Sequence, residues 1–190
     1  MTPRVLGTVG VLGSPMLLVE ELASGPSPEA RTPLMGALSL VFILCWASSV
    51  VGLYRLDGAG ARGAGRVVLL AQLLGLGLAS VWALLHTLGV PDGSTALYRV
   101  TDVAWPFSVL FMLVVGAATA RARVLPGWRG LTPLLCGLAL PVALLGGALA
   151  GGRTAGFVFG VHTTLAWALL GHVVRGAPAP AERPSTARDG

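Results

Sequence analysis

The sequence predicts an all-α fold, a polytopic transmembrane bundle of about six helices with both termini in the cytoplasm. Three observations favour this fold: the composition, a series of apolar stretches of helical length, and a one-sided distribution of arginines. Hydrophobic residues make up 54% of the chain and charged residues 11%, whereas a soluble domain carries about a quarter charged residues. The chain therefore needs lipid as its solvent, and its length fits one helical domain without a sizeable soluble domain beside it.

Apolar stretches of membrane-spanning length recur along the chain. A helix needs roughly twenty residues to cross about 30 Å of hydrocarbon, and five of the six stretches come close to that length. The predicted spans lie near residues 5–20, 33–54, 67–88, 103–120, 131–150 and 156–174. Together they predict one transmembrane domain over residues 1–176.

The first predicted span is the shortest and the least regular. It contains three glycines and Pro15, and it ends at Glu20 and Glu21. Because proline removes a helical hydrogen bond, we expect a kink in this span. The short length also predicts that the two acids lie at the interface, where they remain hydrated.

A cleavable signal peptide is the alternative interpretation of this first stretch. Arg4 precedes an apolar run, and small residues follow at positions 23–25. However, Glu20 and Glu21 stand where a cleavage region should be neutral, so we expect the stretch to remain as a span. Cleavage would leave five spans and a mature N-terminus on the outer side.

The arginines predict the orientation, because Arg and Lys near helix ends favour the cytoplasmic side. With the N-terminus inside, the cytoplasmic segments contain Arg4, Arg55, Arg62, Arg66, Arg121, Arg123, Arg129, Arg175, Arg183 and Arg188. The opposite side contains Arg31, Arg99 and Arg153, together with Glu20, Glu21, Glu29, Asp92 and Asp102. These arginines are scattered between apolar segments rather than gathered on one helix face, which argues against nucleic-acid binding.

Composition also bears on the tail and on the source of the chain. Residues 177–190 are rich in proline and alanine, so we expect a disordered cytoplasmic tail. The chain contains no Lys and no Asn, and Ile43 is its single isoleucine. Because those residues have A/T-rich codons, this usage suggests a G/C-rich bacterial genome and hence a multi-pass protein of the inner membrane.

Small residues on the last predicted span indicate close helix packing. Gly156 and Gly160 have GxxxG spacing, and Thr164 and Gly171 fall near the same helix face. The third predicted span also has a small and polar face, made of Gln72, Gly75, Ala79, Ala83 and His86. Both faces are expected to turn into the bundle, because lipid gives helices no hydrophobic reason to associate.

Two helix starts share a sequence, TPLMGALSL from Thr32 and TPLLCGLAL from Thr132. An inverted repeat of three-helix halves, as found in many transporters, is one explanation. A capping threonine followed by proline at the first helical position is the simpler explanation. We favour the simpler one, because the flanking helices do not align at the same offset.

Ionisable residues at membrane depth are functional candidates, because burying them near lipid is costly. The predicted topology brings five of them to one outer level and so predicts an outward-facing polar cluster of Glu20, Glu21, His86, Asp102 and His162. His172 lies at the opposite, cytoplasmic end. The tryptophans at positions 46, 82 and 167 lie deeper than the others and form no recognisable aromatic box.

Three kinds of chemistry fit such a cluster. A hydrolytic metal site would use two or three His or carboxylate ligands, but the HExxH spacing is absent. Haem ligation would need two histidines at equal depth on facing helices, and His86 and His162 differ in expected depth. Proton-coupled movement of a solute needs only acids and histidines beside a wet cavity.

The sequence therefore predicts a structural, partner-binding or small-solute-handling membrane component. A membrane-embedded, metal-dependent hydrolase using the outer cluster is the alternative. The two cysteines, Cys45 and Cys136, lie in apolar runs without metal-ligand spacing. No metal and no cofactor is predicted, and the expected partners are the lipid bilayer and either a membrane protein or a small solute.

Overall fold

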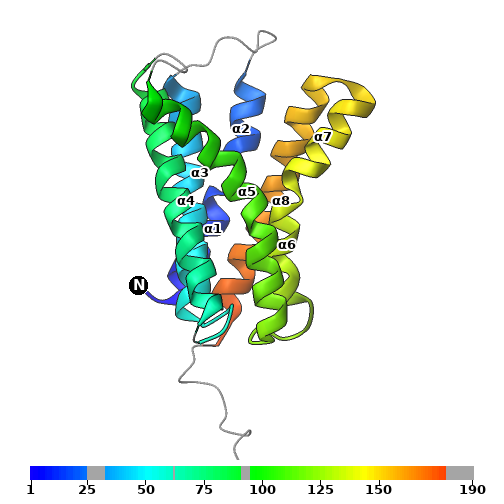
Figure 1. Ribbon diagram of the computed structural model, residues 1–190. Helices are drawn as coiled ribbons and strands as arrows, with labels where there is room; N and C mark the ends of the chain where they lie inside the picture. Colours follow the sequence, from blue (N-terminus) through cyan, green and yellow to red (C-terminus); the bar gives the residue numbers. More distant parts are fainter. Residues whose placement is uncertain (25–32, 62, 91–94, 179–190) are drawn as a thin grey trace, which may run out of the picture.

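The computed structural model describes residues 1–24, 33–61, 63–90 and 95–178. Throughout these residues the regular elements are helices, which pack side by side along one common direction (Figure 1). They are α1 (Pro3–Gly13), α2 (Met16–Ala23), α3 (Pro33–Arg55), α4 (Ala64–Thr87), α5 (Ala96–Ala122), the 3-10 helix η1 (Gly127–Leu131), α6 (Thr132–Gly137), α7 (Ala139–Ala150) and α8 (Gly152–Gly176).

The helices confirm the predicted all-α, polytopic fold. Five helical units in the described residues are long and apolar enough to span a membrane: Pro3–Ala23, Pro33–Arg55, Ala64–Thr87, Ala96–Ala122 and Gly152–Gly176. A sixth unit joins Gly127–Gly137 to Ala139–Ala150 through a bend of 52°. The bundle therefore offers five or six membrane spans.

The first span is broken near its middle, between α1 and α2. Pro15 lies in the break and has no amide hydrogen to donate to the Val11 carbonyl. The Val11 carbonyl instead accepts a hydrogen bond from the amide of Ser14, at 3.3 Å. After the break, α2 carries Glu20 and Glu21 in its last turn.

The fifth span differs from the continuous helix expected over residues 131–150. It bends between α6 and α7, at Leu138. Pro141 accounts for the bend, because a proline ring clashes with the carbonyl four residues earlier, here that of Gly137. The residues on both sides of the bend are apolar, so the apolar pattern did not predict it.

Two further spans begin earlier than the apolar pattern indicates. The fourth starts at Ala96 rather than near residue 103, because Thr95 caps α5 by accepting the Tyr98 amide hydrogen at 3.1 Å. The last starts at Gly152 rather than near residue 156. The first turns of the two helices contain Arg99 and Arg153, so hydropathy marks them less clearly. Of the tail predicted to be disordered, residues 179–190 lie outside the described part.

Seven arginines share one end of the bundle, which we call the arginine end (Figure 1, bottom). The side chain of Arg55, at the end of α3, donates to the backbone carbonyl of Met1. Arg4 and Arg175 line one crevice where α1 begins and α8 ends. The other members are Arg66, Arg121, Arg123 and Arg129.

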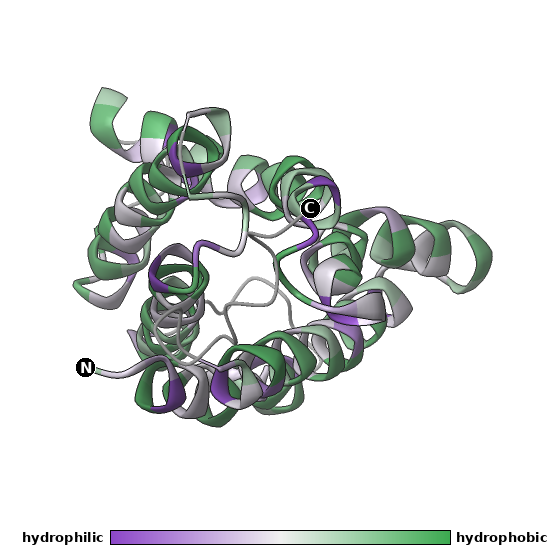
Figure 2. Cartoon of the chain, turned by 90° about the horizontal axis from the view of Figure 1, so that it is seen from below, coloured by the Kyte–Doolittle hydropathy of each residue, from purple (hydrophilic) through white to green (hydrophobic). Residues whose placement is uncertain are grey.

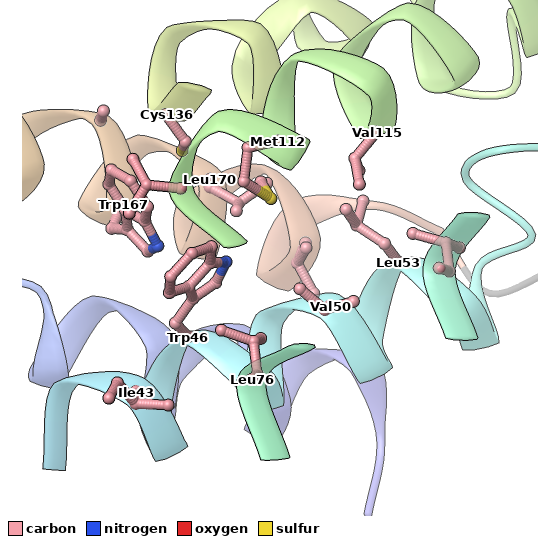
Figure 3. Packing of buried hydrophobic residues seen from close by; sticks show 14 of the residues in the cluster. Ile43, Trp46, Val50, Leu53, Leu76, Met112, Val115, Cys136, Trp167 and Leu170 are labelled. Atoms are coloured by element: carbon pink, nitrogen blue, oxygen red, sulfur yellow. The ribbon is translucent and has the colours of Figure 1, made fainter. Parts of the chain in front are cut away.

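The core of the bundle is apolar and aromatic. Trp46 of α3 and Trp167 of α8 meet edge to face with ring centroids 5.0 Å apart, and each is 1% exposed (Figure 3). Leucines cover the outside instead, and Leu144 and Leu149 are more than 70% exposed. Viewed from the arginine end, the helices are mainly hydrophobic in colour (Figure 2). Such an apolar exterior suits lipid rather than water.

Glycines allow α8 to approach the first span closely. A Cβ atom at Gly171 would lie 2.7 Å from the carbonyl oxygen of Gly7, and one at Gly160 would lie 3.0 Å from the Cα of Leu18. Gly156 faces the side chain of Glu21 in the same way. Thr164 lies on the same helix, and its hydroxyl donates to the Gly160 carbonyl at 2.8 Å.

Candidate functional site

A cavity of about 220 Å³ opens at the end of the bundle opposite the arginines. It lies where α2 and α4 end and where α3, α5 and α8 begin, so five helices contribute to it. We call this end the cavity end. The lining residues are Leu17, Glu20, Glu21, Ser24, Ser39, Trp82, His86, Trp105, Gly156 and Phe159.

Two carboxylates from the last turn of α2 lie at the cavity. Glu20 is held by Ser39 of α3, whose hydroxyl donates to Oε2 at 2.6 Å. The Glu21 carboxylate lies against the backbone of α8, since a Cβ atom at Gly156 would be 2.5 Å from Oε2. Within the described residues, no hydrogen bond or ion pair reaches the Glu21 carboxylate. The helices thus bring negative charge to the cavity.

Aromatic rings form a continuous wall beside these acids. The ring centroids of Trp82 and Trp105 are 6.3 Å apart, and those of Trp105 and Phe159 are 5.5 Å apart. His86 stacks on Trp82 at 5.4 Å, with an interplanar angle of 29°. Its Nδ1 lies 3.2 Å from the hydroxyl of Tyr98, which orients the imidazole. Helices α4, α5 and α8 therefore contribute one aromatic surface.

The indole nitrogens of Trp82 and Trp105 are buried, and neither has a hydrogen-bond partner in the described part of the chain. A buried N–H donor normally finds an acceptor, so water or a solute oxygen in the cavity could accept from these groups. The indole nitrogens of Trp46 and Trp167 in the core have none either. Unpaired indoles alone therefore do not mark a site.

The structure divides the residues of the predicted outer cluster into two groups. Glu20, Glu21 and His86 line the cavity, whereas Asp102 and His162 are not among its lining residues. Asp102 is exposed on α5. His162 reaches the bend of the fifth span, with Nε2 2.8 Å from the carbonyl oxygen of Leu135. Because a carbonyl only accepts, this geometry makes Nε2 the protonated nitrogen.

The third histidine belongs to the arginine end. His172 is exposed near the end of α8, and its Nδ1 lies 3.4 Å from Nη2 of Arg175. It is therefore separate from the cavity.

A metal centre would need three or more His, Cys, Asp or Glu side chains close together. No such group occurs among residues 1–24, 33–61, 63–90 and 95–178. The metal-dependent chemistry considered from the sequence would have used His86, His162 and Asp102 around one ion. The cavity instead combines carboxylates with aromatic rings.

Sequence reasoning did not identify the aromatic wall or Ser39. One signal was present, because Trp82 and His86 are four residues apart and so share a helix face. Trp105 lies near the start of its predicted span, where tryptophan is common at the membrane interface and so does not point to a site. Phe159 and Ser39 carried no signal, because their roles depend on which helices become neighbours.

Comparison with models of known families, with curated proteins and with solved structures gave no match for this chain. The fold and the cavity define the class: an all-α, multi-pass membrane protein with a polar and aromatic cavity at one end of its bundle.

Proposed function

We propose that this protein is a small-solute-handling component of the inner membrane, with both termini in the cytoplasm and a binding cavity that opens outward. The orientation follows from the arginine end, because Arg near helix ends favours the cytoplasmic side. Arg55, Arg66, Arg121 and Arg175 lie at that end, whereas Glu20 and Glu21 lie at the other. The expected partners are the bilayer and a small solute.

The observation that carries the proposal is the convergence of polar and aromatic side chains from five helices on one cavity. Binding pockets combine apolar and aromatic walls with a few placed polar groups, as Trp105, Phe159, Glu20 and Glu21 do here. Ionisable groups near lipid are costly, so their presence at a cavity favours a role in binding. Pockets for drug-sized ligands measure about 300–1,000 Å³. A cavity of about 220 Å³ therefore fits a smaller solute.

A thermal-shift experiment tests this function. Purified full-length protein in detergent is heated with a panel of small cations, anions and neutral solutes. A solute present at about 100 times its Kd stabilises the folded state by about 2.7 kcal/mol, which raises the melting temperature.

Two variants then locate the binding site. The stabilisation should be lost in Trp105→Leu, whose ring lines the cavity, and kept in Trp128→Leu, whose side chain is 55% exposed near the arginine end. If no solute stabilises the protein, or if Trp105→Leu responds like the unaltered chain, solute binding in the cavity is not its function.

A further inference from the structure

We propose that the solute is an organic ammonium ion, a small carbon skeleton that carries one positively charged nitrogen. This inference rests on the proposed function and specifies the chemistry of its ligand. It follows from the charge of the cavity, from its aromatic wall and from the arrangement of its possible metal ligands.

The charge of the cavity favours a cation. Glu20 and Glu21 both line it, and none of its lining residues is an arginine, the single type of basic side chain other than histidine in this chain. The Ser39 hydroxyl orients Glu20 by donating to Oε2 at 2.6 Å. The carboxylate of Glu21 has no hydrogen bond or ion pair within the described residues. A cationic solute would supply that partner, whereas an anion would meet the like charge of the Glu21 carboxylate.

The aromatic wall distinguishes an organic cation from other solutes. The face of an indole or phenyl ring attracts a cation within about 6 Å of its centroid, and Trp is the strongest of the aromatic side chains. Trp82, Trp105 and Phe159 all line the cavity, with neighbouring centroids 6.3 and 5.5 Å apart. An ammonium group in the cavity would lie beside these rings and beside the carboxylates of α2. Clusters of aromatic rings are a known means of recognising quaternary ammonium groups.

The same geometry disfavours a metal ion as the occupant. A bound Zn²⁺ would take three or four His, Cys or carboxylate ligands at about 2.0–2.3 Å. The described residues contain no group of three such side chains close enough to hold a metal. His86 is turned to Trp82 and Tyr98, with its ring stacked on the indole.

Calorimetric titration of the purified full-length protein tests the inference. The probes are choline, its neutral analogue with carbon in place of the nitrogen, and pivalate, a carboxylate of similar bulk. Choline should bind about tenfold more tightly than the neutral analogue, because the cation–π and carboxylate attractions require the charge. Pivalate should not bind measurably.

Matched variants assign the charge effect to Glu21. Glu21→Gln keeps the size of the side chain, removes its charge, and should weaken choline binding about tenfold. Asp102→Asn removes an exposed carboxylate outside the cavity lining and should leave choline affinity unchanged. Each variant should melt at the temperature of the unaltered protein when no solute is present, which shows that it is folded.

The possible outcomes separate this inference from the function on which it rests. Equal binding of choline and its neutral analogue, or tighter binding of pivalate, would overturn the ammonium assignment and leave a solute cavity in place. Equal weakening by Asp102→Asn and Glu21→Gln would overturn it too, since a general surface charge would then explain the binding. If choline fails to bind while another class in the solute panel stabilises the protein, the ammonium assignment alone fails. If no solute in that panel stabilises it, the proposed function fails as well.

Discussion

At the scale of single residues, some side chains of the predicted outer cluster line the cavity and others lie outside it. Glu20 and Glu21 reach the cavity from α2, and the hydroxyl of Ser39 holds Glu20. His162, on α8, instead donates to a carbonyl at the bend of another span. Ionisable residues that were all predicted near the outer end thus lie in different surroundings, which depend on the helices that they face.

The position of Glu21 depends on the absence of a side chain at Gly156. A methyl group at Gly156 would lie 2.5–2.6 Å from the Glu21 carboxylate and must displace it. Because the displaced atoms end a flexible side chain, Gly156→Ala should weaken choline binding severalfold while changing the melting temperature little. Titration calorimetry and thermal unfolding measure the two effects. Gly152→Ala is the control, because a Cβ there meets no atom within 4 Å.

His162 should contribute to stability and not to solute binding. Its Nε2–H donates at 2.8 Å to Leu135, just before the bend at Leu138. His162→Ala removes this link between α8 and the bent span, and the loss of one such bond costs about 1 kcal/mol. We expect a lower melting temperature in detergent and unchanged choline affinity. A large loss of affinity would instead place His162 in the binding site, and His172→Ala controls for the loss of an imidazole.

At the scale of elements, the first span is held by close backbone contacts on two sides. A Cβ atom at Gly7 would lie 2.4 Å from the amide nitrogen of Arg175 and from the Gly171 carbonyl oxygen, both in α8. Gly10 meets the Ser49 side chain of α3 in the same manner. Because lipid gives helices no hydrophobic reason to associate, van der Waals contact between closely packed backbones is a main source of their association energy.

Gly7→Ala should therefore push α1 away from α8. Overpacking of this kind costs about 1–3 kcal/mol, and here the atoms that must move belong to the backbone. Thermal unfolding in detergent should show a clear loss of stability. Gly77→Ala, in the middle of α4, is the matched control, because its Cβ meets nothing within 4 Å and alanine favours the helix. Equal melting temperatures for the two variants would contradict this account of the packing.

At the scale of the whole molecule, the two ends of the bundle differ in the predominant sign of their charged side chains, and the cavity lies at one of them. At the arginine end, the N-terminal residues lie beside the C-terminal end of α8. At the cavity end, Glu20 and Glu21 line the cavity. Five or six spans link these ends. The proposed orientation makes the cavity accessible from outside the cell.

Reporter fusions test that orientation. Fusions after Arg62, Arg129 and Arg175 should report the cytoplasm, and a fusion after Asp92 should report the opposite side, because the arginines are retained inside. Alkaline phosphatase and a fluorescent protein give complementary signals at each position. An outer location after Arg129 would contradict the six-span topology. An outer location after Arg175, with Arg129 inside, would instead mean that the bent α6–α7 unit enters and leaves the membrane on one side.

How much could be predicted depends on the range of the interactions involved. The helices of the bundle follow from local hydropathy, which requires no knowledge of neighbours; for this reason the stretches near residues 33–54 and 67–88 predict α3 and α4 to within a few residues. The ends of the helices are harder to predict. The cap at Thr95 and the first turns of α5, which contain Arg99 and Asp102, lie outside the apolar pattern. The bend at Leu138 was not predicted either, although Pro141, which accounts for it, is present in the sequence.

What the sequence by itself determined is the class of fold, because apolar length and composition act one helix at a time. The sequence also predicted which acids and histidines would lie at membrane depth. Only the tertiary structure decided that Glu20, Glu21 and His86 share a cavity with Trp105, while His162 serves the bend of the fifth span. The physical reason is that a helix face acquires its role from the helix packed against it. That choice of neighbour depends on contacts such as Gly7 with Gly171, which are far apart in sequence.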